Sequence, residues 1–210
     1  METNLAMNRS ATNPLQGEHE FSFSDADYKF IYRFIYDQTG IVLGDNKREM
    51  VYGRLARRLR ANKLTSFAEY RELLESSGGH EEMLQMINAL TTNLTKFFRE
   101  NHHFEHLANV TLKAALANTG SRPARIRIWS AGCSSGQEPF SIAMTAHKSV
   151  SDLARHDLKI LATDVDSNMV ARGSTGEYAS YETDSIPADL RHKHLVNADA
   201  AGNRLRFTDD

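Results

Sequence analysis

The apolar residues between about residue 21 and residue 117 recur with helical spacing. In the first segment, "SDADYKFIYRFIYDQTG", four large apolar side chains fall on one helical face: Phe30, Ile31, Phe34 and Ile35. Ser24 or Asp25 is placed to cap the start of this helix, and Gly40 is placed to end it. The pattern predicts a small all-helical domain over residues 21–117.

Two further features divide this helical region. The stretch "SFAEYRELLESSGG" predicts a helix that Ser66 caps, with Glu69 three residues on, and that Gly78-Gly79 ends. A long stretch with helical spacing follows from residue 80, but polar side chains interrupt it between Thr91 and Arg99. We therefore expect two helices in that stretch, with a break between them.

The spacing of apolar residues changes after "NTGSRPA", residues 118–124, which is polar, contains Gly and Pro, and reads as a linker. A strand is predicted at residues 125–130, a helix at about 139–150, and a second strand in "LKILATDVD". Strand, helix and strand within about 40 residues form a βαβ unit with parallel strands. The predicted fold is thus a helical domain followed by a doubly wound, Rossmann-like α/β domain over residues 125–210.

The two ends of the sequence carry weaker patterns. Residues 1–20 are polar with few large apolar side chains, which predicts a disordered tail. Near the other end, the sequence predicts a short helix after Pro187 and a hairpin turning near Gly202. A doubly wound domain needs roughly 150 residues, at about 30 for each βαβ unit. Only 86 follow residue 124, so we expect an incomplete sheet.

Composition limits the classes of partner. The 25 basic and 27 acidic residues give a net charge of −2, so bulk charge does not make the chain a polyanion binder, and any basic feature is local. A single cysteine, Cys133, excludes an intramolecular disulfide framework and suits a reducing compartment. The sequence shows neither a signal-peptide pattern nor an apolar run of about 20 residues. We expect a soluble, cytoplasmic protein.

The clearest candidate for a ligand site is "RIRIWSAGCSSGQEPFSIAM", in which small residues join the first strand to its helix. Neither a dinucleotide-binding G-x-G-x-x-G nor a P-loop lysine is present. Glu138 in the first turn of the helix would repel a phosphate but can hold an ammonium group, while Gly132 and Gly136 let the backbone approach a ligand. S-adenosylmethionine fits, because it combines adenosine with two cationic groups and has no phosphate. The alternative is that small residues only permit tight strand–helix packing.

Two carboxylates support a nucleoside ligand independently. Asp164 and Asp166 follow the second strand at its carboxyl end. An acid in that position can accept hydrogen bonds from both ribose hydroxyls of a nucleoside. The loop and the acid together predict a cofactor site at this edge of the sheet.

A basic stretch lies in the helical domain. Val51, Leu55 and Leu59 share one helical face, and the opposite face carries one sign of charge, from Lys47, Arg54, Arg57 and Arg58. Such a face can bind an acidic helix or a nucleic acid. No aromatic residues interleave the arginines, so we favour a protein partner over a nucleic acid. A merely soluble surface is the simpler alternative.

The stretch "NALTTNLTKFFRENHHF" can be read as a capped helix start with an aromatic anchor. His102, His103 and His106 have a spacing that could suit a metal on a helix face. However, no acid-plus-histidine signature such as H-E-x-x-H accompanies them. We expect no metal site.

In this order, "GIVLGDNKREMVYGRLARRLR", "INALTTNLTKFFRENHHF", "RIWSAGCSSGQEPFSIAM" and "ILATDVD" resemble the chemotaxis receptor methyltransferases, the CheR family of protein-glutamate O-methyltransferases. The resemblance covers about residues 23–180, and it implies that residues 187–207 are the start of a small β-subdomain inserted in the methyltransferase domain. It implies that Asn93, Thr95 and Arg99 reach the cofactor from the helical domain, with Arg99 as the catalytic-site arginine. Glu138 would hold the methionine end of the cofactor and Asp164 its ribose.

The resemblance also implies partners and an activity. Arg54, Arg57 and Arg60 match the family's basic helix, which is thought to dock on the methylated helices of the receptors. The implied reaction transfers a methyl group from S-adenosylmethionine to glutamate side chains of methyl-accepting chemotaxis receptors and leaves S-adenosylhomocysteine. The implied protein is an enzyme of signal transduction and a monomer, without a nucleic-acid partner, a metal or membrane insertion.

The match departs from the family pattern near the end of the chain. The family's later segments, with an Asn-Leu pair, an Arg-Asn pair and a tyrosine near the transferred methyl, have no counterpart before Asp210. We therefore expect weak or no turnover from this chain. A non-catalytic module that docks on receptors or senses cofactor stays open, as does a nucleic-acid methyltransferase.

The implied reaction needs no general base. A glutamate side chain has a reference pKa of about 4.3, so at neutral pH it is already the carboxylate nucleophile. Positioning of the two reactants can supply roughly 7–11 kcal/mol of the barrier, and a dry pocket favours a reaction in which opposite charges disappear. The lack of a Ser/His/Asp or Cys/His set agrees with this chemistry, and Cys133 is interpreted as a small loop residue.

Overall fold

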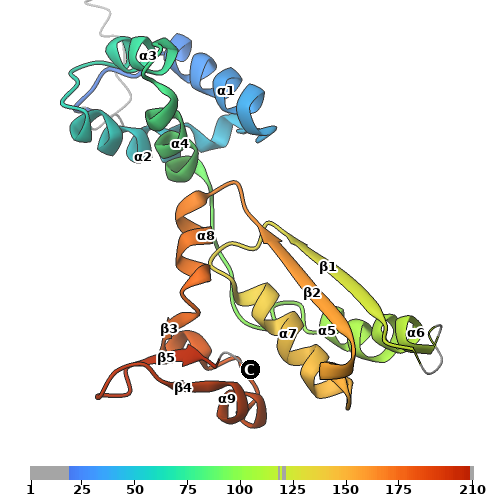
Figure 1. Cartoon of the computed structure of the whole chain (residues 1–210). Coiled ribbons are helices and arrows are strands. Elements are labelled where there is room, and N and C mark those ends of the chain that lie inside the picture. The colour runs from blue at the N-terminus through green and yellow to red at the C-terminus, as the bar shows by residue number, and fades with distance from the viewer. Residues whose placement is uncertain (1–18, 118, 120–121, 209–210) are drawn as a thin grey trace, which may run out of the picture. The chain divides into compact units, whose positions relative to one another are not determined.

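The structure is a computed structural model that describes residues 19–117, 119 and 122–208. The chain forms two compact units, Met1–Met86 and Ile87–Asp210. Figure 1 shows the helices of the first unit in blue and green and the strands and helices of the second in yellow-green to red. No helix within the described residues is long and apolar enough to cross a membrane.

The first unit is helical, as predicted. Its elements are α1 (Asp25–Thr39), the 3-10 turn η1 (Asp45–Lys47), α2 (Arg48–Ala61), α3 (Phe67–Glu75) and α4 (His80–Leu90), the last of which runs on into the second unit. Among its fully buried side chains are Ile31, Ile35, Val51, Leu55, Leu59 and Tyr70. The apolar face predicted for the basic stretch is therefore confirmed.

The helix ends follow from local chemistry. Ser24 caps α1 in a reciprocal capping box with Asp27, and Gly40 ends the helix in the left-handed conformation with φ 75°. Ser66 caps α3, also as predicted. The predicted end of α3 at Gly78-Gly79 is wrong, because the backbone already becomes extended at Ser76.

The break predicted between Thr91 and Arg99 is confirmed, since residues 91–101 form no helix. After it come α5 (His102–His106), the π-helical turn η2 (Leu107–Thr111), α6 (Leu112–Ala117), β1 (Arg125–Ala131), α7 (Gln137–Ser149), the 3-10 turn η3 (Leu153–Arg155), β2 (Asp157–Thr163), α8 (Ser167–Ser174), β3 (Glu177–Ala179), the 3-10 turn η4 (Ser180–Thr183), α9 (Ala188–His194), β4 (Leu195–Asn197) and β5 (Arg204–Phe207).

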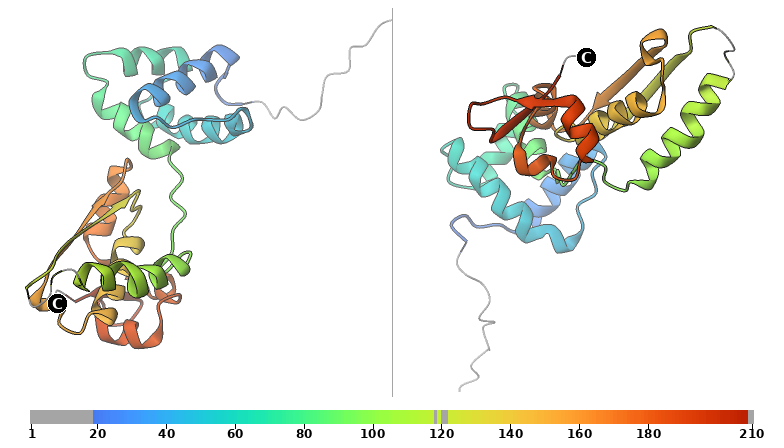
Figure 2. Two further views of the ribbon diagram at one scale, coloured as in Figure 1. Left: turned by 90° about the vertical axis from the view of Figure 1, so that its right-hand side faces the viewer. Right: turned by 90° about the horizontal axis from the view of Figure 1, so that it is seen from below.

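The predicted βαβ unit is confirmed. β1 and β2 pair in parallel, in a register that runs from Arg125 opposite Asp157 to Ala131 opposite Thr163. Helix α7 lies along this sheet (Figure 2). One apolar cluster joins Ile126 of β1 to residues of α6 and α7: Leu112, Ala146 and Val150. The parallel pairing brings the carboxyl ends of both strands to one edge, where β1 leads into α7 and β2 leads into α8.

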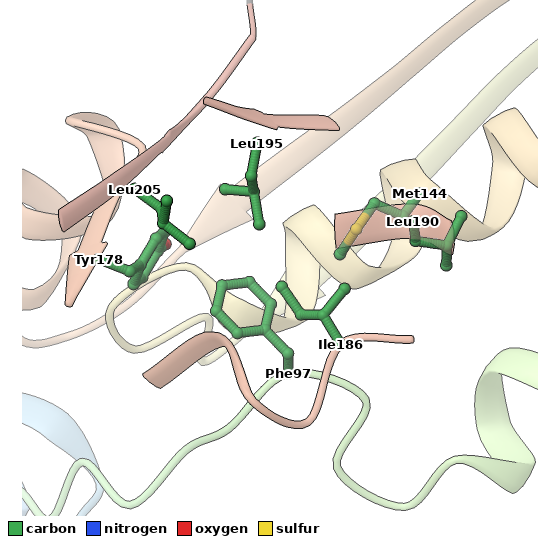
Figure 3. Packing of buried hydrophobic residues seen from close by; sticks show 7 residues of the cluster. All are labelled: Phe97, Met144, Tyr178, Ile186, Leu190, Leu195 and Leu205. Carbon is green, nitrogen blue, oxygen red and sulfur yellow. The ribbon is translucent and has the colours of Figure 1, made fainter. Parts of the chain in front are cut away.

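The predicted hairpin is also confirmed, as β4 and β5. The sheet gains a third strand that was not predicted, so its order is β3-β5-β4, with all pairs antiparallel. A core cluster ties this sheet to α7 and to the 91–101 segment: Phe97, Met144, Tyr178, Ile186, Leu190, Leu195 and Leu205. In Figure 3 the ring of Phe97 projects from the 91–101 segment into the middle of that cluster.

The predicted fold class, a helical part followed by an α/β part and a small β-sheet, is confirmed. The predicted domain limits stay predictions.

Much of the tail predicted over residues 1–20 lies outside the described residues, as do three residues of the 118–124 linker. The two tail residues that are described contact α2: His19 stacks on Tyr52 with ring centroids 3.8 Å apart, and Glu20 binds Arg60.

Candidate functional site

The loop between β1 and α7, residues 132–136, is fixed at the carboxyl edge of the parallel sheet. The N–H groups of Gly132 and Cys133 both donate to the carbonyl oxygen of Thr163, at 2.8 and 2.9 Å. Gly132 and Gly136 have φ values of 88° and 95°, which side-chain-bearing residues rarely adopt. The loop therefore reverses direction directly above the ends of both strands.

Tyr178 of β3 binds this loop through its hydroxyl group. Its buried hydroxyl donates to the carbonyl oxygen of Ser135 at 2.7 Å. Burial, above all, raises the pKa of Tyr178, so the hydroxyl keeps the proton that it donates. A Cβ atom at Gly136 would lie 2.7 Å from the same hydroxyl. The close approach of Tyr178 is thus a second reason why position 136 requires glycine.

Glu138 lies in the first turn of α7, as predicted, and is exposed. Its carboxylate accepts a hydrogen bond of 2.6 Å from the hydroxyl of Ser130, a buried residue near the end of β1. The N-terminal end of a helix stabilises a negative charge. An anionic side chain is therefore held above the end of β1, where it can bind a cation.

Asp164 follows β2 directly and is half-buried. One carboxylate oxygen accepts from the Ser134 N–H at 2.7 Å, and the other accepts from the Asp166 N–H at 2.8 Å. Each carboxylate oxygen has two acceptor positions. Asp164 therefore keeps one position on each oxygen for a ligand.

Asp166 differs from Asp164, because it is only 2% exposed and protein groups hold both of its oxygens. One oxygen caps α8 by accepting from the N–H groups of Asn168 and Met169, at 3.0 and 3.3 Å. The other lies 2.8 Å from the hydroxyl of Thr91 and 2.6 Å from the side-chain nitrogen of Asn93. Of the two acids that the sequence placed after the second strand, only Asp164 is available to a ligand.

The 91–101 segment carries three of the predicted site residues. Asn93 is half-buried, and its backbone carbonyl lies 3.5 Å from the hydroxyl of Ser134. Thr95 is half-buried as well. Arg99 is exposed, and its guanidinium donates to the carbonyl oxygen of Leu94 at 2.8 Å.

Backbone strain surrounds Arg99. Its two neighbours, Phe98 and Glu100, have φ values of 52° and 56°, a region that is uncommon for residues other than glycine. The N–H of Phe98 donates to the buried hydroxyl of Ser141 on α7 at 3.0 Å. Strained residues that the surrounding structure holds in place cluster at functional sites, so the geometry favours a functional role for this turn.

Cys133 is buried within the loop. Burial raises the pKa of its thiol, and the nearby carboxylates of Asp164 and Glu138 raise it further. A neutral thiol is a poor nucleophile. This agrees with the interpretation of Cys133 as a small loop residue.

The structure thus brings several predicted residues to one place, at the carboxyl edge of β1 and β2. Ser134 joins Asn93 to Asp164, and Gly132 and Glu138 lie on the same loop and the helix that follows it. The sequence reasoning missed the supporting roles of Asp166, Ser141 and Tyr178. Of these three, only the role of Asp166 could be predicted from the sequence, because an acid just before a predicted helix is a typical N-cap.

The basic face of α2 belongs to the first unit. Arg57 is exposed, Arg54 is half-buried, and Arg60 binds Glu20 through two nitrogens, at 2.9 and 2.5 Å. The placement of Arg58 on the exposed face is wrong. Its side chain bends toward α4, where it binds the buried carboxylate of Glu82 at 2.9 and 2.5 Å.

The residues at the sheet edge suit S-adenosylmethionine chemically. A carboxylate with two open acceptor positions matches a pair of ribose hydroxyls, and the exposed carboxylate of Glu138 matches an ammonium group. Among the described residues, no group of three or more metal-ligating side chains occurs.

Two family models match the chain. "CheR methyltransferase, all-alpha domain" covers residues 26–91, and "CheR methyltransferase, SAM binding domain" covers residues 93–208. The second agrees with the cofactor class inferred from the loop and the acid.

Several curated relatives are similar over most of the chain. A protein of Rhizobium etli named probable chemotaxis protein methyltransferase is 40% identical over 176 residues, which make up 84% of this chain and 65% of that protein. The chemotaxis protein methyltransferase of Escherichia coli strain K12 is 42% identical over 182 residues, or 87% of this chain and 60% of that protein. Chemotaxis protein methyltransferase 2 of Pseudomonas aeruginosa is 39% identical over 192 residues, or 90% of this chain and 65% of that protein.

The chain therefore spans 60–65% of the length of these relatives. The resemblance found in the sequence is confirmed by the two family models, which match the helical part and the α/β part in turn. The chain belongs to the CheR methyltransferase family.

Proposed function

We propose that this chain contributes the cofactor site of a protein-glutamate O-methyltransferase that acts on methyl-accepting chemotaxis receptors in the cytoplasm. The observation that carries the proposal is the difference between two neighbouring acids. Asp166 is buried and protein groups hold both of its oxygens, whereas Asp164 keeps one acceptor position on each oxygen at the edge of the sheet. The names of the relatives support methyl transfer in chemotaxis.

Each residue at the edge has one task in this proposal. Asp164 accepts hydrogen bonds from the ribose hydroxyls of S-adenosylmethionine, and Glu138 binds the amino group of its methionine part. Gly132 lets the backbone approach the cofactor. The 91–101 segment adds Asn93, Thr95 and the catalytic-site arginine, Arg99.

The cofactor supplies an activated methyl group, and the protein orients it. Because a glutamate of the receptor is ionised at neutral pH, the site has no proton to remove. Its contribution is to hold the two reactants in line and to exclude water. The strained turn at Arg99 fits this task, because a hydrogen bond from Phe98 to the buried hydroxyl of Ser141 holds its backbone.

The basic face of α2 is proposed to bind the receptor. Arg57 and Arg60 are its exposed members, and Arg54 is half-buried. Because the chain spans less than two thirds of its relatives' length, full turnover is proposed for the whole protein. Binding of the product S-adenosylhomocysteine, without a metal, is proposed for this chain.

The deciding experiment is calorimetric titration of the 210-residue chain with S-adenosylhomocysteine. NAD and ATP serve as control ligands, and circular dichroism confirms that the chain is folded. Selective binding of S-adenosylhomocysteine would support the proposed site. A folded chain that prefers NAD or ATP, or that binds none of the three, would contradict it.

A further inference from the structure

The buried carboxylate of Asp166 joins two parts of the second unit. It caps α8, and its second oxygen receives the side chains of Thr91 and Asn93, which lie 75 and 73 residues earlier in the chain. Buried charges require such complete pairing. Here the pairing uses a residue proposed to contact the cofactor.

The contact fixes the orientation of the Asn93 amide. A carboxylate can only accept hydrogen bonds, so the atom of Asn93 that lies 2.6 Å from Asp166 has to be the nitrogen. The same nitrogen lies 3.4 Å from the hydroxyl oxygen of Thr91. The hydroxyl oxygen and the carboxylate oxygen are themselves 2.8 Å apart, so both lie on one side of the nitrogen, and the amide is held with its nitrogen toward Asp166.

We propose that Asp166 is a positioning residue for the cofactor site: it holds the nitrogen of the Asn93 amide, so that the side chain turns its oxygen, a hydrogen-bond acceptor, to the cofactor. The cofactor group that Asn93 recognises is then a donor, such as an amino or hydroxyl group, and not a carboxylate. This inference rests on the proposed function, and it adds a residue and a polarity to the site.

Asp166→Asn tests the positioning with little change in size. Asparagine has one acceptor oxygen where aspartate has two. Asparagine is also a good N-cap, so its oxygen should turn to the N–H groups at the start of α8. Its NH₂ group then faces the NH₂ group of Asn93 and displaces it. We expect affinity for S-adenosylhomocysteine to fall about tenfold, with the far-ultraviolet circular dichroism unchanged.

Ser167→Ala is the matched control. Ser167 is the next residue, and it exchanges hydrogen bonds with Asn88 at 3.1 and 3.2 Å, so it joins the same two segments without touching Asn93. We expect this variant to keep its affinity. Equal affinity of Asp166→Asn and wild type, or an equal loss in both variants, would overturn the inference.

A double variant in which the two side chains are exchanged tests whether the cofactor group is a hydrogen-bond donor. In the double variant Asn93→Asp/Asp166→Asn, the aspartate at position 93 offers only acceptor oxygens, and the asparagine at position 166 can donate to one of them. If the cofactor group is a donor, most of the tenfold loss should be recovered. If the affinity falls further than in the single variant, the group is an acceptor and the inferred polarity is wrong.

A ligand-free measurement separates this inference from the proposed function. In nitrogen-15 spectra the side-chain amide of Asn93 should exchange slowly with solvent in the wild-type chain and rapidly in Asp166→Asn. Should the wild-type chain bind no S-adenosylhomocysteine, the proposed function fails. Slow exchange would then still support the positioning role of Asp166, and rapid exchange in the wild type would overturn it.

Discussion

The backbone N–H of Ser134 donates to the carboxylate of Asp164 at 2.7 Å, across 30 residues of sequence. This bond joins the loop after β1 to the end of β2, and the N–H of Asp166 binds the other oxygen of the same carboxylate. The acid proposed to bind ribose therefore also shapes the loop beside it.

Asp164→Asn should lower affinity for S-adenosylhomocysteine more than tenfold, because the amide keeps only one acceptor oxygen for two backbone N–H groups and a ligand. Calorimetric titration measures the change. Asp157→Asn is the control, since Asp157 is an exposed acid at the start of the same strand, paired with Arg127. An Asp164→Asn variant that binds S-adenosylhomocysteine like the wild type would show that Asp164 does not bind the cofactor.

Arg99→Ala should weaken binding of S-adenosylhomocysteine by about tenfold or more, the range for a lost hydrogen bond to a charged group. The fold should persist, because the side chain is exposed and its described contact is with Leu94. The control is Lys96→Ala, which removes an exposed positive charge from the same segment. In the whole protein we expect the arginine variant to abolish methyl transfer, and unaltered turnover there would contradict its catalytic role.

Glu82→Gln should destabilise the first unit. Burial alone would raise the pKa of Glu82, but hydrogen bonds from Arg58, Asn62 and Tyr70 outweigh it and lower that pKa. Breaking a buried pair by removing one partner costs about 3–5 kcal/mol, and the partial exposure of Arg58 favours the lower end. Urea unfolding measures the loss.

The exposed pair of Arg60 and Glu20 supplies the control for Glu82→Gln. Glu20→Gln should leave the urea midpoint nearly unchanged, because water screens an exposed pair. The stability due to Glu82 should be complete above its ordinary pKa of 4.5 and be lost as pH falls through the lowered value of the folded chain. A pair that contributes equally at pH 3 and pH 7 would contradict this account.

His194 should make the second unit less stable in mild acid. Its ring packs near His147 of α7, with centroids 5.4 Å apart, and within the described residues its Nε2 is the one buried side-chain nitrogen or oxygen without a hydrogen-bond partner. Burial lowers the pKa of His194, and the positive charges of His147 and Lys193 lower it further. A proton therefore binds His194 more tightly in the unfolded state than in the folded state.

Stability should accordingly fall as pH drops below about 6.5, the ordinary pKa of histidine. His194→Phe should be more stable than the wild type at pH 5.5, and the difference should shrink at pH 7.5. Thermal melts at both values measure it. His192→Ala changes an exposed histidine on the same helix and should leave the pH dependence of stability unaltered. If His194→Phe loses as much stability between pH 7.5 and pH 5.5 as the wild type does, His194 is not the cause of the pH dependence.

Arg57→Glu should weaken binding to a purified cytoplasmic fragment of a methyl-accepting chemotaxis receptor. The change reverses an exposed charge on α2, so the effect should shrink at high salt, where exposed charges are screened within about 10 Å or less. Arg33→Glu makes the same charge change on α1 and is the control. Cofactor binding should be equal in both variants. Equal receptor affinity of Arg57→Glu and wild type at low salt would exclude the docking role.

The sequence by itself determined the parts of this protein that depend on neighbours along the chain. The helix caps at Ser24 and Ser66, the break after Leu90 and the strand–helix–strand order follow from spacing and from short-range hydrogen bonds. The placement of Glu138 in the first turn of a helix followed in the same way. The family resemblance rested on such contiguous segments, and it was confirmed.

Only the tertiary structure decided which charged groups are free to act. Asp164 and Asp166 look equivalent in the sequence, but contacts with residues 73 and 75 positions away saturate one of them. Arg58 looks like part of a basic face, but its guanidinium finds a buried carboxylate on α4. Periodicity reports which side of an element a residue occupies, whereas the availability of a charge depends on what folding brings against it.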